Sequence, residues 1–240
     1  MQKTTNFNAI KINSRKITVF LFSIAGVMLL AHLAGQIEKY IFDHPSIYGL
    51  VPLFNLNNEN NIPTLFQSVI LVTSSFLLII VSLLESQRKE SRTAFWVLLS
   101  LGFSLMAVDE WFEFHEKLTQ PLRDWIGATS LGVFYFTWVI AGILVVALAI
   151  LFFYRFVKKL DQKTGRTFIL AAFLYIGGLI GFELIGGLAA ETSGTENLFF
   201  NLLVACEETL EMSGVIVFIN GLLGFLSRSY PIFTINIEQK

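Results

Sequence analysis

The sequence predicts an all-α polytopic membrane protein, a six-transmembrane-helix bundle with both termini in the cytoplasm. Hydrophobic residues make up 54% of the 240 residues and charged residues 15%, and the mean hydropathy is +0.65. Soluble domains contain about 25% charged residues. Six apolar runs are long enough to cross a bilayer. Most basic residues fall in alternate connections between these runs.

The six predicted spans follow one another with no soluble domain between them, so we expect residues 1–240 to form a single membrane domain. A helix of about 20 apolar residues crosses a hydrocarbon core of about 30 Å. The first run follows basic residues, as in a signal peptide, but it is long and no small-residue cleavage site closes it, so we expect it to be retained. We place the spans at about 17–36, 63–85, 93–115, 131–154, 167–189 and 198–226.

The basic residues assign each connection to one side of the membrane. Of the 17 Lys and Arg residues, only Lys39, Lys117 and Arg123 follow the first, third or fifth span. By the positive-inside rule, the side that carries the others is cytoplasmic and holds both termini. The chain has no N-x-[ST] sequon, which fits a bacterial cytoplasmic membrane protein. The residues on the cytoplasmic side are Lys3, Lys11, Arg15, Lys16, Arg88, Lys89, Arg92, Arg155, Lys158, Lys159, Lys163, Arg166, Arg228 and Lys240.

Two of the connections on the other side are longer than any connection on the cytoplasmic side. The first, at about 37–62, contains the polar run 55-NLNNENN-61, and we expect a solvated loop there. The segment 120–130 is also an outer loop, and its Trp125 suits the membrane interface.

The fifth span carries a glycine pair. Gly177 and Gly181 have the G-x-x-x-G spacing, which lets a neighbouring backbone approach closely, so we predict a helix-packing partner there. The single Cys206 excludes an internal disulfide. Because the basic residues act as orientation signals, we expect the lipid bilayer and no nucleic acid as a partner.

Acidic residues interrupt three of the apolar spans. The third span ends in 106-MAVDEWFEFHEKL-118, where a continuous helix places Asp109, Glu113 and Glu116 on one face at i, i+4 and i+7. In the sixth span Glu207 and Glu211 share a face, and Glu208 lies beside them. The fifth span adds Glu183, and the first span adds His32.

These polar residues are predicted to lie at one height in the membrane. Four of them are 16 or 17 residues from the nearest basic residue at the cytoplasmic boundary, namely His32, Asp109, Glu183 and Glu211. At 1.5 Å per residue, that distance is about 24–26 Å, in the outer third of the bilayer. The remaining acids of the third and sixth spans lie about one turn further out.

A layer of acids in lipid predicts a site. A charged residue at the bilayer centre costs about 2.5–3.5 kcal/mol, and neighbouring carboxylates also repel one another. Either some of the acids are protonated or a bound cation neutralises them. Carboxylates with imidazole suit Mn, Fe, Mg or Ca and admit Zn. The predicted ligands of a divalent metal ion are Asp109, Glu113, His115, Glu116, Glu207, Glu208 and Glu211, and Glu183 or His32 completes the site or transfers a proton.

Other interpretations remain open for single residues. Glu110 and Glu116 can instead extend to the outer water, and His115 can be an interfacial histidine. The Glu-x-x-His pair of many carboxylate di-iron bundles is absent, because Phe112 stands three residues before His115.

Three functions fit the predicted site. The first is a metal-dependent enzyme that acts on a lipid or quinone-like substrate at the outer leaflet, with Glu183 and His32 as catalytic residues. The second is a transporter of protons or divalent cations. The third is a non-catalytic membrane subunit or assembly factor. Apart from serines, threonines and Asn220, the cytoplasmic half of the spans has few polar residues, which argues against an ion path.

The segments 109-DEWFEFHE-116, 182-FELIGG-187 and 207-EETLEMSG-214 resemble the signatures of a family of small bacterial multipass membrane proteins. Its members carry a DE-x-x-E-x-HE motif in a middle span and an EE-x-x-EM-x-G motif in the last span. The resemblance implies that the residues to test are Asp109, Glu113, His115, Glu116, Glu183, Glu207, Glu208 and Glu211, and it implies no particular reaction.

Overall fold

The fold is helical throughout the residues that the computed structural model describes, which are 13–88, 92–128 and 130–230. Six helices are long and apolar enough to cross a membrane, as predicted. Lys3, Lys11, Lys89 and Lys240 lie outside the described residues. The six candidate spans are Ser14–Tyr40, Ile62–Gln87, Thr93–Phe112, Trp138–Lys158, Gln162–Ser193 and Leu198–Ser229.

Five of these spans are single helices, and the fifth in order is composite. The single helices are α1 (Ser14–Tyr40), α3 (Ile62–Gln87), α4 (Thr93–Phe112), α7 (Trp138–Lys158) and α10 (Leu198–Ser229). The composite span consists of α8 (Gln162–Ile176), the π-helical segment η2 (Gly177–Phe182) and α9 (Glu183–Ser193). The short elements are α2 (Leu50–Leu53), α5 (Phe114–Lys117), α6 (Thr119–Ile126) and the 3₁₀ turn η1 (Gly132–Phe134).

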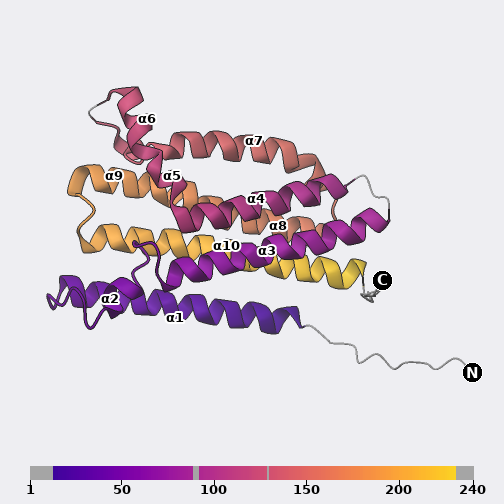
Figure 1. The fold of residues 1–240 in the computed structure, drawn as a ribbon, viewed down its shortest axis with the longest axis horizontal. Helices are drawn as coiled ribbons and strands as arrows, with labels where there is room; N and C mark the ends of the chain where they lie inside the picture. The colour runs from indigo at the N-terminus through magenta and orange to yellow at the C-terminus, as the bar shows by residue number, and fades with distance from the viewer. Residues whose placement is uncertain (1–12, 89–91, 129, 231–240) are drawn as a thin grey trace, which may run out of the picture.

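The long helices run roughly antiparallel, so the basic residues gather at one end (Figure 1). The start of α1, the α3–α4 and α7–α8 connections and the end of α10 lie at this end, which we call the basic end. The opposite end holds α2, α5, α6 and the α9–α10 connection. The described basic residues at the basic end are Arg15, Lys16, Arg88, Arg92, Arg155, Lys158, Lys159, Lys163, Arg166 and Arg228.

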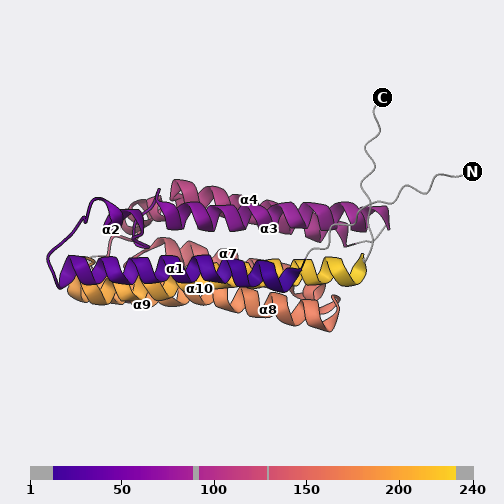
Figure 2. The same cartoon turned by 90° about the horizontal axis from the view of Figure 1, so that it is seen from below.

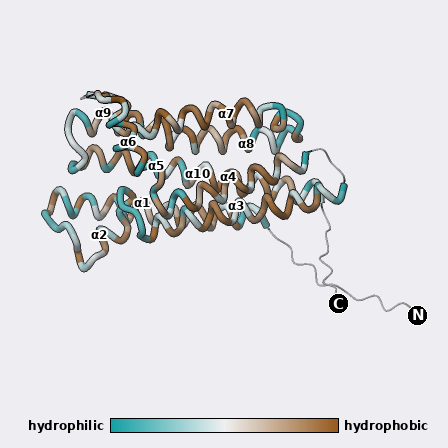
Figure 3. The backbone as a smooth tube through the Cα atoms, turned by 45° about the horizontal axis from the view of Figure 1, so that its top comes forward, coloured by the Kyte–Doolittle hydropathy of each residue, from teal (hydrophilic) through white to brown (hydrophobic). Residues whose placement is uncertain are grey.

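Helix α10 is the centre of the bundle. It packs against α1, α3, α8 and η2, and α3 pairs with α4. Figure 2 shows α3 and α4 as a layer on one side of α10 and the α8–α9 span along the other side. Hydrophobic residues follow the middle of the long helices, and hydrophilic residues gather at both ends (Figure 3). This distribution is the one a bilayer requires.

Close helix packing in the fifth span is made by Gly178. A Cβ at Gly178 would lie 2.7 Å from the backbone oxygen of Glu207 on α10, whereas a Cβ at Gly177 or Gly181 would meet nothing within 4 Å. The predicted glycine pair therefore does not make the close approach within the chain. A separate packing partner at these two glycines stays a prediction.

The third span ends earlier than the predicted 93–115. Glu113 has φ 53° and ψ 41°, the left-handed conformation, and this residue separates α4 from α5. The Asp109 carboxylate accepts a hydrogen bond from the backbone N–H of His115 at 3.0 Å, replacing the bond that a continuing helix would supply. The expectation that Asp109, Glu113 and Glu116 share the face of one helix is therefore wrong.

The fourth span begins later than the predicted residue 131, because α7 starts at Trp138. The Glu191 carboxylate accepts backbone hydrogen bonds from Leu131 at 3.0 Å and from Gly132 at 2.6 Å. Gly132 has φ 56°, which suits a glycine in a turn. These contacts hold the chain in the turn η1 before the helix begins.

Candidate functional site

Acidic side chains gather at the end of the bundle opposite the basic end. Glu208 on α10 interacts electrostatically with Glu110, Glu59, Glu183 and Glu116. We call the whole group the carboxylate cluster, and its members are Glu59, Asp109, Glu110, Glu113, His115, Glu116, Glu183, Glu207, Glu208 and Glu211. The structure thus brings together all seven residues predicted as metal ligands, and Glu183 with them.

Asp109 and His115 form a pair at the α4–α5 break. Oδ2 of Asp109 lies 2.6 Å from Nδ1 of His115, and Oδ1 accepts from the His115 backbone N–H at 3.0 Å. Because a carboxylate only accepts, Nδ1 is the donor and Nε2 faces away from Asp109. Burial, the largest effect, lowers the pKa of His115, but the hydrogen bond and charge of Asp109 and the charge of Glu116 raise it above its usual value.

Trp138 links this pair to the fifth span. Its indole ring lies edge-on to the His115 ring, with centroids 4.7 Å apart. Its Nε1–H donates to Oε1 of Glu183 at 2.7 Å. The Glu183 carboxyl group also lies next to that of Glu207 on α10. The first residue of α7 thus holds Glu183 in the cluster.

The π-helical segment places Glu183 against α10. Single π-helical turns inside α-helices are rare. Those that do occur are frequently found at functional sites. A Cβ at Gly178 would lie 2.8 Å from Cγ of Glu211, so only glycine permits this approach. Glu211 is buried and lies beside the hydroxyl of Tyr175 on α8. Sequence reasoning did not identify Tyr175.

The loop before α3 contributes Glu59, which the sequence analysis assigned to a solvated loop. Instead, this loop folds into the bundle and buries Asn55 and Leu56. Oε2 of Glu59 accepts from Oγ1 of Thr64 at 3.0 Å. Burial and the charges of neighbouring carboxylates raise the pKa of Glu59 to about 7. The only signal in the sequence was its position, three residues before the second span and near the height of the acidic layer.

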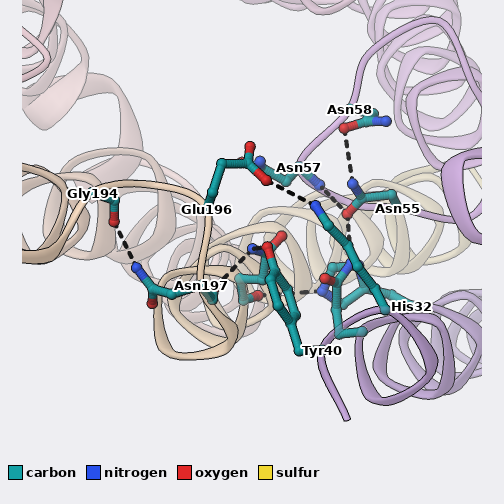
Figure 4. Close-up of polar contacts among 11 residues, drawn as sticks. His32, Tyr40, Asn55, Asn57, Asn58, Gly194, Glu196 and Asn197 are labelled. Atoms are coloured by element: carbon teal, nitrogen blue, oxygen red, sulfur yellow. Dashed lines mark hydrogen bonds and ion pairs between the residues drawn. The ribbon is translucent and has the colours of Figure 1, made fainter. Parts of the chain in front are cut away.

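His32 lies in a different polar network, at the join of α1, the loop and α10 (Figure 4). Its Nε2 donates to the backbone oxygen of Asn201 at 3.2 Å, and its Nδ1 accepts from the backbone N–H of Leu56 at 3.0 Å. Nearby, Gln36 donates to Oδ1 of Asn55 at 2.9 Å. Both ring nitrogens of His32 are therefore occupied in holding the loop. A catalytic role for His32 stays a prediction.

The cluster has little compensating positive charge. Among the residues that the structure describes, neither Lys nor Arg forms an ion pair with a cluster acid, and the His115–Asp109 pair is the one contact of this kind. Within the same residues, no group of three or more His, Cys, Asp or Glu side chains already has an arrangement that could hold a metal ion. The acidic side chains of the cluster lie near one another, but among the described residues no three of them converge on a common point.

One family model matches residues 20–225, and its description is domain of unknown function (DUF8692). No curated protein and no solved structure matches the chain.

Proposed function

The chain belongs to the family described as domain of unknown function (DUF8692), and we propose that it is an integral membrane protein that binds a divalent cation in its carboxylate cluster. The observation that carries this proposal is the charge imbalance at the end of the spans. Nine carboxyl groups and one imidazole meet there, and no described Lys or Arg pairs with them. In a medium of low dielectric, such a group needs protons or a cation.

The donor set favours a cation that prefers oxygen ligands with some nitrogen. Glu207, Glu208 and Glu211 project from one helix, and the charge of Glu116 on α5 acts on Glu208. Mn, Fe, Mg and Ca accept such donors, and Zn is also compatible. Since no three donors already converge, binding would draw the carboxylates together.

Asp109 fits the role of a residue that orients His115. Metal-binding histidines commonly donate their other ring N–H to a carboxylate, which fixes the tautomer. Both Asp109 oxygens already accept from His115, so Nε2 of His115 is the nitrogen available to a cation. We therefore assign His115 as a ligand and Asp109, which the sequence analysis counted as a ligand, as the residue that positions it.

The most specific form of the proposal is a metal-dependent enzyme acting on a lipid or quinone-like substrate. Glu183 suits proton transfer, because its carboxyl group contacts both Trp138 and Glu207.

The alternative, a proton or cation transporter, needs a path to the basic end. Midway along α3 and α4, the Ser75 hydroxyl bonds to the Ser100 hydroxyl at 2.9 Å and to the Ser104 hydroxyl at 2.8 Å. Satisfied hydroxyls favour a binding site over a path.

Metal analysis tests the proposal. Full-length protein purified without chelators should contain about one or two equivalents of a divalent metal by elemental analysis. The double variant Glu208→Gln, Glu211→Gln should lose it, because two ligands become neutral amides. Glu196→Gln is the matched control, since Glu196 lies near the same end but pairs with Lys39 at 2.9 Å.

Two results would contradict the proposal. Metal-free wild-type protein that takes up no cation on dialysis would exclude the site. Equal metal content in the double variant and the control would place the ligands elsewhere. Cation flux into vesicles, abolished in the double variant, would instead support the transporter.

A further inference from the structure

A polar pocket of about 370 Å³ opens at the basic end of the bundle, at the opposite end from the carboxylate cluster. Helices α1 and α8 both pack on α10, and the pocket lies where their first turns flank the last turns of α10. Figure 3 shows hydrophilic residues in the α7–α8 connection at the same end of the bundle. The lining residues are Ser14 of α1, Lys163 and Thr167 of α8, and Asn220, Gly221, Gly224 and Arg228 of α10.

Two glycines of α10 form the floor of the pocket. A Cβ at Gly221 would lie 3.0 Å from side-chain carbons of Thr167 and Phe168, and a Cβ at Gly224 would lie 3.1 Å from Nη1 of Arg228. Because neither position has a side chain, α8 and the Arg228 guanidinium can lie close to the α10 backbone. The backbone of α10 at these two glycines is therefore part of the pocket lining.

The pocket carries an excess of positive charge. Its lining includes Lys163 and Arg228 and no acidic residue. Arg228 is anchored, because its Nη2 lies 2.7 Å from Oγ1 of Thr164 and 3.3 Å from Oδ1 of Asp161. Asp161 also accepts from the Thr164 backbone N–H at 3.1 Å and so caps α8. Within the described part of the chain, no carboxylate pairs with Lys163.

Neutral donors complete the lining. Asn220 stands in an otherwise apolar stretch of α10, between Ile219 and Gly221, and its amide has no hydrogen-bond partner among the described residues. A polar group placed in such a stretch costs free energy unless it finds a partner. With the Ser14 hydroxyl, the amide adds N–H and O–H donors to an ammonium and a guanidinium, the combination that binds phosphate oxygens.

We propose that this pocket binds the phosphate of an anionic phospholipid headgroup. The pocket lies where the apolar spans end, the depth at which lipid phosphates are found. Exposed apolar side chains follow on the same two helices, where Phe20 on α1 is 63% exposed and Ile169 on α8 is 62% exposed, and these offer surfaces for acyl chains. A free phosphate ion shares the headgroup chemistry but gains nothing from these surfaces.

Lipid titration of the full-length chain tests the proposal. Native mass spectrometry would measure the dissociation constants of phosphatidylglycerol and phosphatidylcholine in a neutral detergent. Lys163→Gln should weaken phosphatidylglycerol binding about fivefold, the effect of one lysine near an anionic lipid. Lys159→Gln is the matched control, because Lys159 is an exposed cation at the same end that does not line the pocket. Asn220→Leu, which removes the amide, should also weaken binding.

The expected pattern is a preference for phosphatidylglycerol that Lys163→Gln and Asn220→Leu reduce and Lys159→Gln preserves. Equal weakening by the two lysine variants would overturn the proposal, because it would show general surface attraction. No preference for the anionic lipid in the wild-type protein would also overturn it. Complete displacement of the lipid by about 10 mM inorganic phosphate would assign the pocket to the free ion and refute the lipid assignment.

Discussion

Asp109 and His115 are six residues apart, and their pairing depends on the helix break between them. On a straight helix the two side chains would lie far apart around the axis. The left-handed Glu113 turns the chain back, so that the imidazole reaches the carboxylate at 2.6 Å. The hydrogen-bonded Asp109 and His115 side chains are therefore one structural unit within the carboxylate cluster.

The substitution Asp109→Asn should lower the pKa of His115. An amide oxygen can still accept from a donor, but the negative charge that favours imidazolium is lost. A pH titration of the histidine ring signals by NMR would measure the change. His44, which pairs with Glu38 at 3.0 Å outside the cluster, is the internal control. An unchanged His115 titration would show that Asp109 does not set its charge.

Glu59 makes the stability of the folded protein depend on pH. Its folded pKa is raised to about 7 from an ordinary value of 4.5, mainly by burial, so the folded chain holds this proton more tightly than the unfolded chain. The free energy of unfolding should therefore fall as the pH rises from about 4.5 to about 7, by roughly 1–3 kcal/mol.

Glu59→Gln should remove this part of the pH dependence. Melting temperatures of metal-free protein between pH 5 and pH 8 would show a flatter profile for the variant. The increase in melting temperature over the wild-type protein should be largest at about pH 8. Glu196→Gln should keep the wild-type profile. Parallel profiles for all three proteins would contradict the burial of Glu59.

The acids on the spans were predictable because charged residues in apolar runs are conspicuous. Glu59 and Tyr175 were not. Glu59 lies in a run of asparagines whose composition is that of a solvated loop, and only contacts such as that between Leu56 and His32 fold it inward. Tyr175 is an ordinary residue in an apolar helix until Glu211 lies beside it.

The π-helical segment is the element on which the cluster geometry depends most. Gly178→Ala should destabilise the protein by about 1–3 kcal/mol, because its Cβ would lie 2.7 Å from the Glu207 backbone oxygen. Gly181→Ala is the control, since its Cβ meets nothing within 4 Å. Thermal unfolding would compare the two, and equal stabilities would show that η2 does not approach α10 this closely.

The positions of the spans followed from the hydropathy of the sequence, but the end of the third span and the start of the fourth span did not. The hydrophobic run of the third span continues past Phe112, and nothing in it marks Glu113 as a turn. The break arises because the Asp109 side chain replaces a backbone partner. Likewise the fourth span begins at Trp138, not at 131, because Glu191 of another span binds the preceding turn.

For the molecule as a whole, the antiparallel order of the spans puts the basic end on one side of the membrane, and we expect that side to be cytoplasmic. Cysteines introduced into a Cys206→Ser background would test this. A membrane-impermeant thiol reagent should label Trp125→Cys in intact cells and Lys159→Cys only after lysis. The reverse pattern would place the carboxylate cluster on the inner side.

Fold class, span number and the layering of the acids were accessible from the sequence because the bilayer imposes a length and a charge pattern on every span. The depth estimate brought Asp109, Glu183 and Glu211 into one layer, and their side chains do belong to one cluster in the structure. His32 has the same predicted height but belongs to another network, because counting along a helix gives height and not direction around its axis.

Helix α7 is attached mainly at its two ends, through Trp138 to Glu183 and through Phe156 to Trp96, whose ring centroids lie 4.9 Å apart. Most of its remaining surface faces outward. The lateral pressure of acyl chains, and not interdigitated side chains, must then keep its midsection in place. A sample stripped of its surrounding lipid annulus would therefore lose that support first along the midsection of α7, between Trp138 and Phe156.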